Sequence, residues 1–198
     1  MKPISLLYEL ERQLKILPHS SPSGFVVVPD RNDVLRWFGV IFVRSGLYTG
    51  GIFHFTIEYP DAFPSELPQF RFLTPLYHPF VAPGDGSVDI SGAFDTNDVK
   101  ITDALEYIKV LFCLTDEIQA GDVRILNPVA FKQLQQAKSQ FEEEANQCAA
   151  TASKSPNHPE SELKFSRPNK EHRALHDFIL TKEWTARDFD WGKYFTAS

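Results

Sequence analysis

The sequence predicts an α+β domain in which a run of strands is followed by helices. Three observations indicate this class: apolar residues at helical spacing near the start, four short strand-like segments within residues 25–73, and two helical segments after residue 100. Short connections between successive strands favour an antiparallel meander, with the helices segregated from it. At 198 residues, the chain is long enough for one well-packed domain with an appendage.

The first element is an amphipathic helix. Its apolar residues recur at helical spacing between charged ones: Leu7, Leu10, Leu14 and Leu17. We expect Pro18 and the Ser/Pro/Gly-rich residues after it to end this helix.

Four strands follow, at residues 25–28, 37–43, 52–59 and 69–73. The second strand is too apolar to keep one face in water along its whole length. The third strand places four large side chains on one face: Phe53, Phe55, Ile57 and Tyr59. Residues 74–100 are rich in Pro, Gly and Asp and predict a long loop, and loops of that length inside a domain are usually functional.

Two helices follow this loop. Thr102 or Asp103 can cap the first, and its apolar stripe consists of Leu105, Ile108, Leu111 and Phe112. Asn127 can cap the second, with Pro128 in its first turn, and we expect this helix to continue past Cys148. Its inward residues would be Phe131, Leu134, Phe141 and Ala145.

The end of the chain differs in composition from the rest. Residues 151–160 are rich in Ser and Pro and predict a linker, and a further helix is expected around residues 170–184. These features divide the chain into a domain at residues 1–152 and a linker with a C-terminal extension at residues 153–198.

Composition excludes several classes of function. The formal charge of −6 argues against non-specific binding of nucleic acid and against an anionic membrane surface, because both require clustered Lys and Arg. The two cysteines, Cys113 and Cys148, cannot form a disulfide framework or a zinc-binding set. We expect neither a metal nor a cofactor.

No segment has the apolar core of a signal peptide or the roughly 20 apolar residues of a membrane span, so direct membrane insertion is not expected.

Residues 59–90 contain the most informative motifs. Pro60, Pro64 and Pro68 are spaced at four-residue intervals before a strand, and Tyr77-His78-Pro79 and Gly86 follow it. Together with the order of the predicted elements, these motifs resemble the ubiquitin-conjugating enzymes over roughly residues 1–150. The resemblance implies that family's fold, with residues 74–100 in the place of its active-site loop.

Two departures from that family fall in this loop. Phe80 occupies the position of the asparagine that, in the family, supports the oxyanion formed during lysine attack, and Phe has no donor to offer. The catalytic cysteine is missing as well: depending on how the loop is aligned, its place falls on Asp89, Ser87 or Val88. Thioester exchange depends on a thiolate as nucleophile and leaving group, and none of the three supplies one.

The other residues that could act as catalytic groups have little support from the sequence. His78 is expected to organise the loop, as the matching histidine does in active relatives. Ser87 would need an activating base, and a pair with His78 would still lack a third orienting group. Cys113 falls in the middle of an apolar helix, which predicts a buried and inert thiol. The sequence therefore predicts a conjugating-enzyme variant without catalytic activity.

Longer matches narrow the resemblance to one group. Residues 35–48, 75–81, 86–89, 126–130 and 165–169 are similar to the Fused Toes family, also called the Akt-interacting protein family. The resemblance implies an adaptor that joins a Hook-type coiled-coil protein and a Hook-interacting protein in a complex linking dynein to endosomal or vesicle cargo. It also implies an Akt-type kinase as a further candidate partner, and a cytoplasmic location with attachment to endosomes or microtubules through partners.

The C-terminal extension carries an aromatic cluster: Trp184, Phe189, Trp191, Tyr194 and Phe195. Such residues either pack back on their own domain or bind a partner, and we retain them as candidate partner-binding residues.

Two other functions stay open at this stage. One is a variant that binds ubiquitin non-covalently and assists an active conjugating enzyme, which has only the shared fold in its favour. The other is an enzyme that uses Ser87 or Cys113 as its nucleophile.

Overall fold

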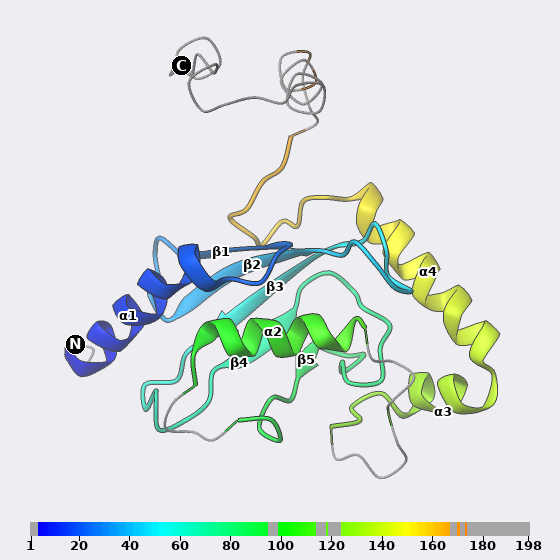
Figure 1. Cartoon of the computed structure of the whole chain (residues 1–198), viewed down its shortest axis with the longest axis horizontal. Coiled ribbons are helices and arrows are strands. Elements are labelled where there is room, and N and C mark those ends of the chain that lie inside the picture. Colours follow the sequence, from blue (N-terminus) through cyan, green and yellow to red (C-terminus); the bar gives the residue numbers. More distant parts are fainter. Residues whose placement is uncertain are drawn as a thin grey trace. The chain divides into compact units, whose positions relative to one another are not determined.

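Five antiparallel strands in a meander form the centre of the structure, a computed structural model that describes residues 4–94, 99–113, 118, 124–166, 170 and 173. The chain divides into two units, Met1–Lys164 and Phe165–Ser198. Every element named below belongs to the first unit (Figure 1). The expected α+β class and the expected order of elements are confirmed within it.

The sheet contains the four predicted strands and one more. The strands are β1 (Phe25–Pro29), β2 (Arg36–Phe42), β3 (Ile52–Glu58), β4 (Gln69–Phe72) and β5 (Ser87–Val88), in that spatial order. Sequence reasoning missed β5 because two residues are too short to show alternation. This short strand pairs with β4, placing Val88 opposite Phe70 and Ser87 opposite Arg71. The loop after β4 is thereby tied to the sheet.

One face of the sheet packs against α2 (Ile101–Leu111), which lies below β1, β2 and β3 in Figure 1. The predicted side chains of β3 are buried on this face, and the ring of Phe55 lies directly over Gly39 of β2. An added Cβ at Gly39 would stand 2.1 Å from that ring, so this position has room only for glycine. Phe112, just after α2, packs its ring against Phe53 and Phe72.

The start of α2 is not capped by Thr102 or Asp103, as the sequence had predicted. The N-cap residue is Lys100, which makes no side-chain cap. Instead, the buried amide of Gln13, on α1 (Ile4–Ser20), accepts a hydrogen bond from the Ile101 N–H at 2.7 Å. A partner distant in sequence therefore replaces the local cap. Helix α1 also continues two residues beyond Pro18, which was expected to end it.

The long second helix predicted after residue 127 is two helices. Asn127 caps α3 (Pro128–Gln136) as predicted, because its side chain accepts from the Ala130 N–H. Ala137 then leaves the helical conformation, with φ −147° and ψ 57°, and α4 (Lys138–Lys154) follows in a new direction (Figure 1). Alanine is a strong helix former, so nothing local marks this break. The change in direction lets α4 bury Phe141, Ala145, Ala149 and Ala152.

Residues 155–164, here called the strap, lie over the sheet face opposite α2 (Figure 1). The His54 imidazole on β3 meets the Pro156 carbonyl at 2.9 Å, and Glu162 and Glu160 approach Arg31 and Arg71. The strap covers part of the outer face of β2 and β3, and α4 also contacts β3. The outer face of these two strands is as buried as the inner one, as predicted for the second strand.

Residues 155–160 of the strap, which were expected to be a linker, fall within the first unit. The predicted boundary after residue 152 falls within α4, and the first unit continues to Lys164. Of the helix expected around residues 170–184, only Lys170 and Arg173 are described, and both are helical.

Among the described residues, none of the helices is long and apolar enough to cross a membrane. Within the same residues, no group of three His, Cys, Asp or Glu side chains is placed to hold a metal ion.

Candidate functional site

His78 holds the loop after β4 against the end of α2. Its Nδ1 accepts a hydrogen bond from the Phe80 N–H at 3.0 Å, and its Nε2 donates to the Leu111 carbonyl at 3.0 Å. These contacts fix one neutral tautomer. Burial lowers the pKa of His78 from 6.5 to about 4. Both ring nitrogens are engaged by backbone, so the imidazole has no lone pair left to act as a base.

Pro79 and Phe80 connect this loop to the residues just before α3. The Pro79 carbonyl accepts hydrogen bonds from the N–H groups of Leu126 and Asn127, at 3.0 and 2.9 Å. The ring of Phe80 is buried, with the Arg124 guanidinium 4.8 Å from its centre. Phe80 thus anchors the loop by packing, at the position where the resemblance to the conjugating enzymes implied an amide donor.

Gly86 turns the loop back into the sheet. Its φ is +75°, and an added Cβ would stand 2.1 Å from the Phe72 carbonyl oxygen. Only glycine fits both conditions. The Gly86 carbonyl in turn accepts from the Phe72 N–H at 2.8 Å, which begins the pairing of β4 with β5.

Ser87, the first residue of β5, has its hydroxyl engaged by a neighbour. The hydroxyl donates to the Asp85 carboxylate at 2.8 Å, and the Ser87 N–H donates to the same oxygen at 3.0 Å. The hydrogen bond from the Ser87 N–H, followed by that from its hydroxyl, lowers the pKa of Asp85 and makes it a weaker base. The structure does not bring Ser87 together with His78, whose nitrogens point to backbone groups.

Val88 and Asp89 also have structural roles. Val88 is buried in β5, with Phe70 and Val81 as strand partners. The Asp89 carboxylate accepts from the Ser91 N–H at 2.8 Å, beside a hollow of about 220 Å³. The three positions where the catalytic cysteine could align therefore present a hydroxyl, an apolar side chain and a carboxylate.

The two thiols lie outside this loop. Cys113 was expected to be buried within a helix, but α2 ends at Leu111 and Cys113 is exposed in the turn that follows. Cys148, on α4, is half-buried: its Sγ donates to the Pro75 carbonyl at 3.2 Å and accepts from the Tyr77 N–H at 3.5 Å. Burial raises the pKa of the Cys148 thiol, which keeps it protonated and unreactive.

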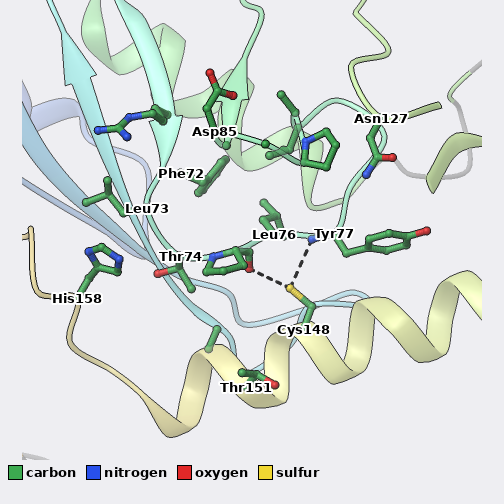
Figure 2. Close-up of a pocket in the computed structure, with 18 of the residues that line it drawn as sticks. Phe72, Leu73, Thr74, Leu76, Tyr77, Asp85, Asn127, Cys148, Thr151 and His158 are labelled. Carbon is green, nitrogen blue, oxygen red and sulfur yellow. Dashed lines mark hydrogen bonds between the residues drawn. The ribbon is translucent and has the colours of Figure 1, made fainter. Parts of the chain in front are cut away.

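Beside Cys148 lies a groove of about 690 Å³, here called the α4 groove. Residues 71–77 form one side, residues 81–86 a second and α4 a third, and the strap closes one end. Figure 2 shows Cys148 between α4 and the backbone around residue 76, with Thr151 and His158 nearby. Sequence reasoning missed this groove because α4 and the strap are far in the chain from residues 71–86, which form its other two sides.

The aromatic residues predicted as partner-binding, Trp184, Phe189, Trp191, Tyr194 and Phe195, all lie outside the described residues. Their role, like the assignment of residues 78–89 as a degenerate catalytic loop, stays a prediction.

Comparison with known proteins identifies the domain. The ubiquitin-conjugating enzyme family matches residues 9–149. Protein crossbronx homolog of Culex quinquefasciatus is 32% identical over 146 residues, which cover 71% of this chain and 63% of that protein. AKT-interacting protein of Homo sapiens is 33% identical over 156 residues, covering 75% of this chain and 52% of that protein. AKT-interacting protein of Danio rerio is 37% identical over 114 residues, covering 56% and 39%.

The chain spans less than two thirds of the length of each of these relatives. The matches confirm the resemblance to both the ubiquitin-conjugating fold and the Akt-interacting protein family.

Proposed function

The chain belongs to the ubiquitin-conjugating enzyme family, and we propose that it is a non-catalytic member that acts as an adaptor. In this proposal it is a subunit of a complex of the Fused Toes, Hook and Hook-interacting-protein type, which links dynein to endosomal or vesicle cargo. It works in the cytoplasm and reaches endosomes or microtubules through its partners.

The non-catalytic part of the proposal rests on one observation: the polar side chains of the loop are engaged in holding it. His78 uses both ring nitrogens on backbone groups, Ser87 donates to Asp85, and Asp89 accepts from Ser91. Phe80 is packed under Arg124. Acyl transfer needs a nucleophile with an activating base and a donor for the oxyanion, and these contacts supply neither.

The adaptor part rests on the relatives. Several are named AKT-interacting proteins, a name that describes binding rather than catalysis. An Akt-type kinase is therefore a candidate partner of this chain. The Hook-type coiled coil and the Hook-interacting protein follow from the resemblance to the Fused Toes family.

A binding assay with three forms of this chain tests the adaptor function. The full chain should capture the C-terminal region of a Hook protein. A chain ending at Lys164 keeps the first unit but lacks the aromatic cluster, so weaker capture would assign part of the binding to residues 165–198. A substitution of the exposed Val129 on α3 serves as a surface control. Absence of Hook capture by the folded full chain would contradict the proposal.

Assistance to an active conjugating enzyme is the alternative, and it has no support beyond the shared fold. Titration of labelled chain with ubiquitin to millimolar concentration, followed by NMR, separates the two. We expect no shift changes; saturable changes confined to one face would favour the alternative.

A further inference from the structure

We propose that the α4 groove is a docking site for a short segment of a partner protein that carries apolar side chains next to a Lys or Arg. The proposal deepens the adaptor function, on which it rests for the existence of a protein partner. It assigns the contact to a surface of the first unit whose lining does not include residues 78–80.

The floor of the groove is apolar and already formed. Phe72, Leu76 and Ala152 line it and are nearly fully buried, and Pro75 and Pro83 extend the apolar surface outward. A volume of about 690 Å³ lies within the usual range for ligand sites of roughly 300–1,000 Å³. The groove can therefore take the apolar side chains of a short peptide.

The walls of the groove are fixed by contacts between distant segments. Cys148 holds α4 to the backbone of Pro75 and Tyr77, and the Tyr77 hydroxyl donates to Gln133 of α3. On the opposite side, Gly86 ties the loop at residues 81–86 to Phe72. A site held in this way loses little conformational freedom when a ligand binds.

The rim of the groove is acidic, which identifies the kind of segment that fits. Asp85, Glu144 and Glu160 are exposed around it, and Arg71 is the one Lys or Arg among the described residues that line it. Arg71 faces Glu160 at 3.9 Å, so Asp85 and Glu144 provide the excess negative charge. Charge complementarity favours a basic segment and disfavours a phosphorylated peptide or a nucleic acid.

Selection from a display library of random nonapeptides against the full chain tests the proposal. The selected peptides should combine apolar residues with Lys or Arg. Their affinity, measured by fluorescence polarisation, should fall by about fivefold or more in Glu144→Lys, where the rim charge is reversed. Glu143→Lys makes the same change one residue away on α4 but outside the groove lining, so it should bind nearly as the natural chain does.

A second pair of variants tests the groove's shape. Thr151→Trp places a large ring at the groove, whereas Ala150→Trp places it on an exposed position of α4 outside the lining. Thermal melting checks that each variant is folded. Loss of peptide binding in Thr151→Trp alone is expected.

Three results would overturn the proposal: no peptide is selected, the selected peptides lack basic residues, or they bind Glu144→Lys and Thr151→Trp unchanged. Capture of the Hook C-terminal region without selection of a basic peptide would leave the adaptor function standing and remove the groove as its site. Selection of a basic peptide without Hook capture would support the groove as a docking site and contradict the Hook-adaptor function.

Discussion

His78 shows at the scale of one residue how a motif shared with the conjugating enzymes is used for structure. The side chain is fully buried and joins two backbone segments that are 31 residues apart, Phe80 and Leu111. The neutral ring satisfies both contacts, whereas protonation would turn Nδ1 from an acceptor into a donor facing the Phe80 N–H. The folded state therefore resists protonation of this residue.

This resistance predicts how stability depends on pH. The pKa of His78 is about 4 in the folded state and 6.5 as an ordinary value, so the unfolded chain takes up the proton first as pH falls. Stability is fully present above pH 6.5 and is lost progressively between pH 6.5 and 4, by about 3 kcal/mol in total. His54, whose pKa burial also lowers, acts in the same direction.

Urea unfolding at pH 7.5 and pH 5 measures this effect in the natural chain and in His78→Gln. We expect a loss of about 2 kcal/mol at pH 5 in the natural chain and a clearly smaller loss in the variant. An equal pH dependence in both chains would show that His78 is not the titrating group.

At the scale of elements, the loop between β4 and β5 depends on one glycine. Gly86→Ala forces a side chain into φ +75° and against the Phe72 carbonyl, so we expect a loss of stability of about 1–3 kcal/mol. Gly84→Ala is the matched control, because a Cβ added there meets no atom within 4 Å. Equal melting temperatures for the two variants would contradict this view of the loop.

The elements also show what the sequence could and could not reveal. Alternation along β3 and the cap at Asn127 are local signals, and both predictions are confirmed. The break at Ala137 was missed because alanine favours a helix, and β5 was missed because two residues are too short to show alternation. The exposure of Cys113 was missed because the sequence does not show that α2 ends at Leu111. The family motifs located the loop, whereas only the structure showed that Ser87 and His78 have different partners.

At the scale of the whole molecule, the strap, residues 155–164, belongs to the first unit. Its ion pairs are largely exposed and contribute little, so we expect its contacts with the buried His54 on the outer face of the sheet to matter more. The α4 groove likewise could not be predicted, because the strap and α4 meet residues 71–86 only in the folded chain.

Truncation tests the extent of the domain. A chain ending at Lys164 retains the strap and should melt near the temperature of the full chain. A chain ending at Lys154 uncovers part of the outer face of the sheet, which includes Phe38 and Val40, so it should melt at a lower temperature and bind a hydrophobic dye. Identical melting of the two truncated chains would show that the strap does not stabilise the domain.

The absence of conjugating activity is the central claim, and a charging reaction tests it most directly. The chain is incubated with activating enzyme, ATP and ubiquitin, beside an active conjugating enzyme as a positive control. We predict that the control forms its thioester and that this chain forms no adduct. Ubiquitin attached to the chain itself, through a reducible bond to Cys113 or a hydroxide-labile bond to Ser87, would contradict the account.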